Sequence, residues 1–132
     1  LKNMTSQINP KKVLEDGIIT PCEFTECQQV GVDCTVSEGV VLKKGDCYNV
    51  LLNETIKLPS DMYATLQQRS SYSRKGVFVT SGVYDPGYEG SLGCTIYNFG
   101  EEIVIPKDTR ILQVLVFKAD SASSYNGQWQ GK

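Results

Sequence analysis

Short apolar segments, separated by turn-forming Gly, Pro, Asn or Asp, recur about every ten residues through most of the chain. Each run has the length of a strand, and most are rich in β-branched or aromatic residues, which favour extended structure. Runs of this size and spacing are typical of antiparallel sandwiches and barrels. The clearest are residues 30–36, 48–52, 62–66, 77–83, 92–97, 103–105 and 111–117. The sequence therefore predicts an all-β fold.

Helical structure is expected only in short pieces. No segment as long as an ordinary helix keeps an apolar period of 3.6 residues without a helix-breaking residue. The best candidate for a helix is residues 70–75, and a turn or two is expected near residues 10–14. With 132 residues, of which 40% are hydrophobic, we expect a single domain that spans residues 1–132 around one core.

Composition excludes several classes of chemistry. The chain has no histidine, so Ser-His-Asp and Cys-His nucleophiles, HExxH metal sites and histidine-bearing zinc deaminase sites are all ruled out. Its 13 basic and 15 acidic residues give a net charge of −2, which argues against nucleic-acid or membrane partners. No apolar run reaches membrane-spanning length and no signal segment opens the chain, so we expect a cytoplasmic protein, or one in the host cytoplasm if the chain is viral.

The five cysteines do not form a metal-binding pattern. Their number is odd and no CxxC pair occurs, whereas a four-thiolate zinc site needs paired ligands on tight turns. The favoured interpretation is small buried apolar residues in a reducing compartment, with one disulfide left open for a hyperthermophilic source. They are Cys22, Cys27, Cys34, Cys47 and Cys94.

The segment of residues 68–76 combines cations with hydroxyls directly after an expected strand. If Ser70 begins a helical turn, the free backbone N–H groups, the hydroxyls of Ser70 and Ser71, and the guanidinium groups of Arg69 and Arg74 would converge on a polyphosphate. The alternative is an N-capped, solvated surface turn with no ligand. The segment alone leaves both interpretations open.

A second segment, residues 80–90, is built around Asp85-Pro86-Gly87, which predicts a tight turn. The residues on either side should form a hairpin with Asp85 at its mouth and Tyr88 nearby. Aspartate is also favoured at the first turn position for local hydrogen bonding, so the turn by itself does not require a catalytic role.

Together, these segments resemble the paired motifs of the dUTPase and dCTP deaminase superfamily. Gly31-Val32-Asp33 resembles the first family motif, and residues 110–114 resemble a later strand motif that carries a glutamine. The four motifs occur in the family order and cover about residues 28–117. The polar tail, residues 119–132, is similar to the nucleotide-covering tail of the deaminase-like branch. The central matches are Arg69-Ser70-Ser71, Arg74, residues 80–88 and Gly90.

The resemblance implies a distorted jelly-roll β-barrel, with a short helical turn after the Arg-Ser-Ser motif, that assembles as a homotrimer with active sites shared between subunits. In that site Asp85 would activate water, and Tyr88 would pack on the deoxyribose. The resemblance further implies a phosphate-holding set of Arg69, Ser70, Ser71 and Arg74, with Gln113 supporting the phosphates, Mg²⁺ and water, and a base-reading hairpin with Val83 and Tyr84. The tail departs from the usual pattern of the family. In it, Tyr125 or Trp129 would stack on the base and Gln128 or Lys132 would reach the phosphates; the alternative is a floppy tail that covers nothing. Mg²⁺ would be held mainly by the phosphates, with Asp33 as an outer or structural partner.

One residue position distinguishes the deaminases of the superfamily from the dUTP hydrolases. Aligned on the superfamily motif, Thr95 occupies the position of the deaminase glutamate, and a threonine hydroxyl cannot act as a carboxylate general base. We therefore expect a dUTP diphosphatase that uses Mg²⁺ and converts dUTP and water to dUMP and pyrophosphate. The alternatives are a dCTP deaminase, a bifunctional deaminase and diphosphatase, or a catalytically silent nucleotide-binding regulatory relative.

Overall fold

The computed structural model describes residues 6–120 and 125–132. The elements within these residues are almost all strands, as the sequence predicts. In chain order they are α1 (Pro10–Glu15), β1 (Ile19–Thr20), β2 (Glu26–Cys27), β3 (Val32–Thr35), β4 (Val40–Leu42), β5 (Cys47–Lys57), β6 (Met62–Gln68), α2 (Ser70–Ser73), β7 (Val77–Thr80), β8 (Val83–Tyr84), β9 (Glu89–Asn98), β10 (Ile103–Ile105) and β11 (Arg110–Lys118).

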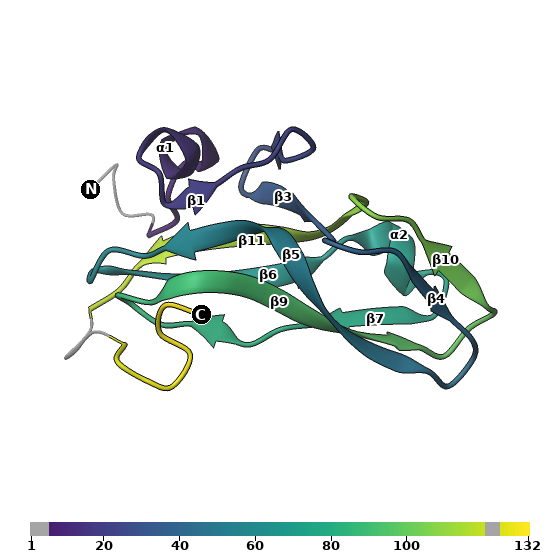
Figure 1. Cartoon of the computed structure of the whole chain (residues 1–132). Coiled ribbons are helices and arrows are strands. Elements are labelled where there is room, and N and C mark those ends of the chain that lie inside the picture. The colour runs from purple at the N-terminus through teal and green to yellow at the C-terminus, as the bar shows by residue number, and fades with distance from the viewer. Residues whose placement is uncertain (1–5, 121–124) are drawn as a thin grey trace.

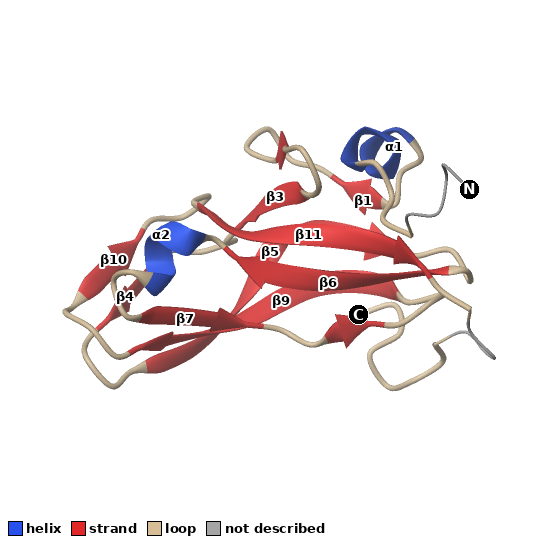
Figure 2. Cartoon of the chain, turned by 180° about the vertical axis from the view of Figure 1, so that it is seen from behind, coloured by secondary structure: helices blue, strands red, loops and turns tan. Residues whose placement is uncertain are grey.

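Two larger sheets form the body of the molecule. One has the strand order β1-β5-β9-β7 and the other the order β2-β3-β11-β6-β8, while β10 and β4 form a separate pair. All of these strand pairings are antiparallel. The sheets are long, twisted and curled about a shared core, as Figures 1 and 2 show from opposite sides. The prediction of a distorted all-β jelly roll is confirmed.

The core follows the alternation of the strands. On β9, Leu92, Cys94 and Ile96 are buried while the residues between them are not, which is the period of two expected where one sheet face packs on a core. Burying one such side chain contributes about 1.5–3 kcal/mol to stability. This packing gives the cavities described below a rigid floor.

Both predicted helical segments are present. Asn9 caps α1 because its side chain accepts a hydrogen bond from the N–H of Lys11, and Pro10 occupies the first turn, where no N–H is needed. Helix α2 begins at Ser70, as expected, but it ends at Ser73 rather than at residue 75. Gly76 follows with a φ of 80°, a left-handed conformation that redirects the chain into β7.

A buried carboxylate fixes the segment that leads into β3. Glu54 is fully buried and accepts hydrogen bonds from the N–H of Thr35 at 2.9 Å, from the hydroxyl of Thr35 at 3.0 Å and from the hydroxyl of Thr25 at 2.5 Å. Satisfying the carboxylate in this way avoids the cost of a buried polar group without partners. These bonds hold β3, and with it Asp33, in place.

The hairpin around Asp85 differs from the sequence expectation. The turn is confirmed, since the N–H of Tyr88 donates to the carbonyl of Asp85 at 3.1 Å and Gly87 has a φ of 82°. The expectation of one continuous hairpin is wrong, because β7 pairs with β9 only as far as Thr80 opposite Thr95, and β8 then pairs with β6 in the other sheet. Glycine in a strand supplies no side chain to support pairing, and this chain has Gly82 on one arm and Gly93 on the other.

None of the helices in the described parts of the chain is long and apolar enough to cross a membrane. All five cysteines are free. Cys34 and Cys94 are buried, as expected; burial raises the pKa of the Cys94 thiol to about 12, and burial also raises the pKa of the Cys34 thiol. Cys27 and Cys47 are exposed, which contradicts the expectation for these two.

Candidate active site

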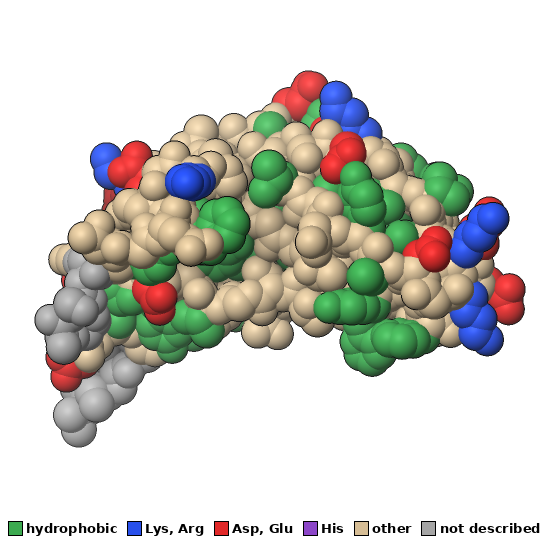
Figure 3. All heavy atoms as spheres, turned by 60° about the horizontal axis from the view of Figure 1, so that its bottom comes forward, with side chains coloured by type: hydrophobic (Ala, Val, Ile, Leu, Met, Phe, Trp, Pro, Cys, Tyr) green, Lys and Arg blue, Asp and Glu red, His purple; other side chains and the backbone are tan. Residues whose placement is uncertain are grey.

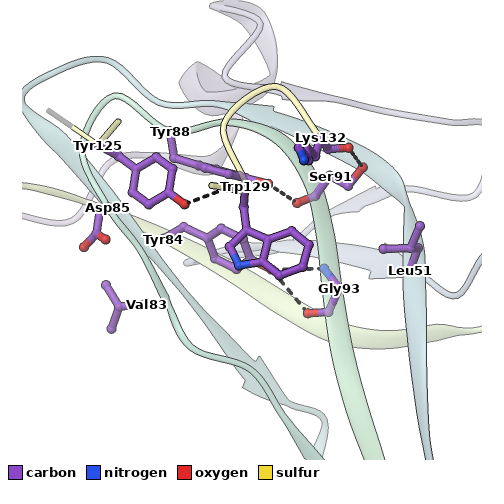
Figure 4. A pocket seen from close by; sticks show the side chains of 10 residues that line it. All are labelled: Leu51, Val83, Tyr84, Asp85, Tyr88, Ser91, Gly93, Tyr125, Trp129 and Lys132. Atoms are coloured by element: carbon purple, nitrogen blue, oxygen red, sulfur yellow. Dashed lines mark hydrogen bonds between the residues drawn. The ribbon is translucent and has the colours of Figure 1, made fainter. Parts of the chain in front are cut away.

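The first candidate site is a cavity of about 480 Å³ beside the Asp85 turn, which we call the hairpin cavity (Figure 4). It combines β8, the turn, the start of β9 and the end of the chain. Asp85 supplies the carboxylate among the described lining residues, and the remainder of the lining is mostly aromatic or small. The lining residues are Leu51, Val83, Tyr84, Asp85, Tyr88, Ser91, Gly93, Tyr125, Trp129 and Lys132.

Three tyrosines form one wall of this cavity. The ring of Tyr88 lies 5.3 Å from that of Tyr84 and 5.3 Å from that of Tyr125, which it meets edge to face. Tyr88 is buried, and its hydroxyl donates to the carbonyl of Ser91 at 2.8 Å. Burial, and then the neighbouring Tyr84 and Tyr125, raise the pKa of Tyr88, so it remains a neutral phenol. The wall is therefore a rigid apolar surface suited to packing against a flat or ring-shaped ligand.

Asp85 stands at the exposed mouth of the cavity, where the sequence predicts it. The turn fixes its backbone, and its side chain and that of Val83 lie on the same side of the aromatic wall in Figure 4. An exposed carboxylate beside an apolar surface is placed to accept a proton from a water molecule at the edge of a bound ligand.

The end of the chain docks on its own hairpin. The N–H of Tyr125 donates to the carbonyl of Pro86 at 2.6 Å, and that of Gly131 donates to the carbonyl of Glu89 at 2.7 Å. The side chain of Gln130 ties the end of the turn to the start of β9, because it donates to the carbonyl of Gly87 at 3.0 Å and accepts from the N–H of Glu89 at 2.8 Å. The sequence patterns did not single out Gln130.

The expected tail residues have different positions. Tyr125 and Trp129 both line the hairpin cavity, and the Trp129 ring is 59% exposed, so one of its faces is free for a ligand. Lys132 lines the cavity, and its carbonyl accepts from the Ser91 hydroxyl at 2.7 Å. Gln128 is exposed and is not among the lining residues. Part of the predicted covering tail, residues 121–124, lies outside the described residues.

The second candidate site is a polar cavity of about 470 Å³ at the start of α2, which we call the clamp cavity. Residues Arg69, Ser70, Ser71, Gln113 and Asp33, all expected from sequence, meet here. Arg74 is exposed and is not among the lining residues. Four glutamines that sequence analysis did not assign complete the lining: Gln28, Gln29, Gln67 and Gln68.

Strand register explains the polar floor of the clamp cavity. Gln113 on β11 is paired with Asp33 on β3 and with Gln67 on β6, so the three side chains form a row across one sheet face. Asp33 is buried and accepts a hydrogen bond from the side chain of Gln28 at 2.9 Å. A Cβ on Gly31 would lie 2.6 Å from Cγ of Gln113, so glycine at this position leaves room for the glutamine. The Gly31-Val32-Asp33 motif thus builds the floor of this cavity.

The clamp cavity and the hairpin cavity have no lining residue in common. Figures 1 and 2 show α2 and the C-terminal end of the chain towards opposite ends of the sheets. One chain therefore brings the expected catalytic and sugar-contacting residues together, and separately the expected phosphate-holding residues, without uniting the two sets.

A third cavity, of about 560 Å³, adjoins the hairpin cavity and shares Leu51 and Gly93 with it. Thr95 lies here, and its hydroxyl donates to the Oδ1 atom of Asn49 on the neighbouring strand at 2.7 Å. Glu38, a residue that sequence analysis did not consider, also lines this cavity. Nothing in the local sequence around Glu38 or Asn49 indicates this meeting, because it depends on how β5 pairs with β9.

The family model described as dCTP deaminase-like matches residues 29–119, which include both central motifs. The chain belongs to the dUTPase and dCTP deaminase superfamily. A dCTP deaminase of Pyrococcus abyssi is 30% identical, and the match covers 91% of this chain and 90% of that protein. A probable deoxyuridine 5'-triphosphate nucleotidohydrolase of Methanococcoides burtonii is 33% identical over 64% of this chain.

The chain spans about half, 52%, of the Methanococcoides relative. Among solved structures, the dCTP deaminase of Agrobacterium tumefaciens matches with a TM-score of 0.76 at 19% identity, over 89% of this chain and 49% of that one. Structures of dUTPases match the same fold, among them a dUTPase from phage phi11 of S. aureus that coordinates a structural Mg(II) ion. The proteins similar to this chain thus include dCTP deaminases and dUTPases.

Proposed function

We propose that this protein is a dUTP diphosphatase in which Asp85 activates the attacking water. The observation that carries the proposal is the carboxylate of Asp85 at the mouth of the aromatic cavity. The motif alignment supports it, because Thr95, which lines the neighbouring cavity, takes the position of the catalytic glutamate of the deaminases of this superfamily. Hydrolysis needs one carboxylate aligned with a water and a clamped polyphosphate.

The hairpin cavity suits the nucleoside part of the substrate. A deoxyribose would pack on the buried Tyr88 ring, where a 2′-hydroxyl would meet an apolar surface without a partner. Val83 and Tyr84 would lie beside the base, and Trp129 would cover it with the free face of its ring. These contacts select a deoxynucleoside.

The clamp cavity suits the triphosphate. Arg69 brings a positive charge, Ser70 and Ser71 bring hydroxyl donors, and the glutamine side chains bring amide N–H donors. Arg74, exposed next to this cavity in sequence, would join once a polyphosphate is present. The cavity binds charge by many donors rather than by bulk positive charge, in keeping with the net charge of −2.

The site would be completed by assembly of three copies. A nucleotide needs both cavities at once, and a single chain places them apart, so the clamp of one copy would face the hairpin of another. The surface offers apolar area for such contacts: Phe78 and Phe99 are 53% and 60% exposed and their rings lie 5.7 Å apart. Figure 3 shows hydrophobic side chains gathered in patches on one face of the molecule.

The residues present fit a magnesium ion that arrives with the substrate. Among residues 6–120 and 125–132, no group of three acidic or thiol side chains is arranged to hold a metal, but Asp33 and Gln113 place oxygen atoms in the clamp cavity, and Mg²⁺ prefers oxygen ligands with retained waters. When bound, the ion would neutralise charge on the phosphates. Asp33 and Gln113 would orient the waters around it.

The reaction balances without a further co-reactant. A water molecule attacks the α-phosphorus of dUTP, its proton passes to the Asp85 carboxylate, and the bond from the α-phosphorus to the bridging oxygen breaks. Pyrophosphate leaves with that electron pair, and dUMP remains. Holding the water and the α-phosphate together supplies most of the rate enhancement, because the reaction becomes effectively intramolecular.

A second candidate, dCTP deamination, is favoured by one observation: Glu38 lines the same cavity as Thr95 and would supply the missing carboxylate. Glu38 is exposed and accepts a hydrogen bond from the Tyr48 hydroxyl at 3.3 Å, whereas Thr95 is directly bonded to Asn49. In the deaminase interpretation, replacing Glu38 with glutamine would abolish conversion of dCTP to a uracil nucleotide.

The test is an assay of the whole chain with dUTP, dCTP and dTTP in the presence of Mg²⁺, in which pyrophosphate and the nucleotide products are measured. We expect pyrophosphate and dUMP from dUTP, and no uracil nucleotide from dCTP. Formation of dUTP or dUMP from dCTP, lost in Glu38→Gln, would replace the proposal with the deaminase. No product from any nucleotide would favour a regulatory nucleotide-binding protein.

A further inference from the structure

The splayed hairpin leaves one backbone edge of β9 without a partner strand. Pairing between β7 and β9 stops at Thr80 opposite Thr95, and β8 turns away to pair with β6. Continuing the same register would have placed Gly82 opposite Gly93. The N–H and C=O of Gly93 are therefore available to some other group at the boundary of the hairpin cavity and the neighbouring polar cavity.

A side chain of the same hairpin arm takes this edge. The hydroxyl of Tyr84 accepts a hydrogen bond from the N–H of Gly93 at 3.0 Å and donates to the carbonyl of Gly93 at 3.3 Å. Figure 4 shows both bonds, with the Tyr84 ring running beneath Trp129 towards Gly93. The hydroxyl of Ser81 donates to the same carbonyl at 2.9 Å, so the carbonyl keeps one partner if Tyr84 leaves.

One phenol oxygen thus presents an acceptor and a donor to two adjacent backbone groups. A pyrimidine edge has the same chemistry, since a uracil carbonyl beside its imide N–H offers an acceptor and a donor side by side. We propose that Tyr84 gates the base-reading backbone of the hairpin at Gly93, and that its hydroxyl must leave before a base with an adjacent acceptor and donor binds there. This inference rests on the proposed nucleotide binding.

The surroundings allow Tyr84 to move. The residue belongs to the two-residue strand β8, and a Cβ on Gly82, just before that strand, would meet nothing within 4 Å. The Tyr84 ring borders the hairpin cavity and contacts the Tyr88 ring, so the cavity offers space into which the Tyr84 side chain can rotate while it stays in contact with Tyr88. By contrast, a Cβ on Gly93 would lie 3.3 Å from the carbonyl of Val50, so the strand that carries Gly93 is tightly backed by β5.

The gate has a consequence for selectivity. A ligand that satisfies both Gly93 groups replaces both hydrogen bonds of Tyr84, while a ligand that satisfies only one of them leaves a backbone group unpaired. Tyr84 therefore weakens binding of every base that binds at Gly93 by a common factor, whereas the backbone groups of Gly93 penalise ligands without the paired edge, such as an N3-methylated uracil.

The test compares Tyr84→Phe, which removes only the hydroxyl, with the wild-type chain in binding of dUMP. We expect the Kd for dUMP to fall roughly 3- to 10-fold, because the ligand no longer displaces two hydrogen bonds. The dissociation constant of N3-methyl-dUMP should fall by the same factor and should stay above that of dUMP in both proteins. Tyr63→Phe is the matched control, since Tyr63 packs on Phe117 outside all three cavities, and it should leave both constants unchanged.

Amide hydrogen exchange at Gly93 provides a readout that needs no substrate. Exchange should be faster in Tyr84→Phe than in the wild type, and dUMP should slow it in both proteins. Unchanged exchange at Gly93, or unchanged or weaker dUMP binding in Tyr84→Phe, would overturn the gate. If the wild type neither binds dUMP nor hydrolyses dUTP, the proposed function fails, and the exchange comparison alone then supports or overturns the contact of Tyr84 with Gly93.

Discussion

The hairpin cavity and the clamp cavity differ in the chemical character of their lining residues. The first is built mostly from aromatic rings near a single acidic side chain. All of its lining residues except Leu51 come from residues 83–93 and from the end of the chain. The second is built from polar side chains: a row on three paired strands, formed by Asp33, Gln113 and Gln67, and the residues at the start of α2. In the proposed function this difference becomes a division of labour, in which the hairpin cavity would hold the nucleoside and the attacking water and the clamp cavity would hold the charged phosphates.

The largest expected effect is on the hairpin side. Replacing Asp85 with asparagine keeps the size of the side chain but removes the base, so we expect pyrophosphate release from dUTP to fall by about 10²–10⁴-fold or to be abolished. Binding of dUTP should stay within about an order of magnitude, since the clamp is intact. Steady-state kinetics and calorimetric binding measure the two. Retained turnover would remove Asp85 from the mechanism.

Replacing Arg69 with glutamine should affect the clamp side selectively. Loss of one charge-assisted contact is expected to weaken dUTP binding about 10- to 100-fold while leaving deoxyuridine binding unchanged. Because Arg69 also donates to the carbonyl of Arg110 at 3.3 Å, thermal unfolding must be followed in parallel. Equal weakening of dUTP and deoxyuridine would contradict the division between the two cavities.

A smaller effect is expected where the chain end meets the hairpin. Gln130→Ala removes the bridge to Gly87 and Glu89, and we expect KM for dUTP to rise about 3- to 10-fold, because two hydrogen bonds that hold the cover are lost. Gln128→Ala is the matched control, since Gln128 is exposed and does not line the cavity. If the two substitutions change KM equally, the docked position of Gln130 has no role in binding.

The smallest effect concerns the anchor at the end of β11, where Lys118 pairs with Asp61 at 2.9 Å. The hydrogen bond from Lys118 lowers the pKa of Asp61 below its ordinary value in the folded protein. This contribution to stability is therefore present above the unfolded pKa of about 4 and is lost as the pH falls through the folded pKa. Both groups are exposed, so Asp61→Asn should lower Tm by no more than about 2 °C at pH 7.

Once the pH has fallen below the lowered pKa of Asp61, the melting temperatures of Asp61→Asn and the wild type should converge. A difference that grows on acidification would show that the substitution acts through packing rather than through the charge. Activity should not change at pH 7, since neither residue lines the hairpin cavity or the clamp cavity.

Sequence patterns predicted the strands and the local motifs well because these depend on neighbouring residues. Side-chain periodicity predicted the apolar runs that form β6, β9 and β11. The residue types of the local motifs predicted the helical turn that starts at Ser70, and the special geometry of proline and glycine predicted the turn at Asp85. Strands β1 and β2 were not predicted, since each is only two residues long. Strand β4 was also missed, although its three residues match the length of β10, which was predicted.

Long-range pairing could not be read in the same way. The departure of β8 from β9 depends on what β6 offers in another sheet, and the meeting of Thr95 with Asn49 depends on the register of β5. Gln130 and the glutamines of the clamp cavity carry no motif, because an amide side chain becomes functional only through the groups that the fold places around it. Sequence thus indicated the chemistry of each cavity but not how the cavities are arranged.

The central claim, that dUTP hydrolysis needs the hairpin of one copy and the clamp of another, is tested most directly by mixing two impaired variants. The dUTP concentration is kept well below the dissociation constant of Arg69→Gln for dUTP, so that this variant is nearly inactive by itself. Asp85→Asn and Arg69→Gln, unfolded together in equal amounts and refolded, should form mixed assemblies in which about a quarter of the sites combine an intact Asp85 with an intact Arg69. We therefore predict pyrophosphate release from dUTP at about a quarter of the wild-type rate, well above that of either variant alone. A mixture no more active than the separate variants would contradict the account.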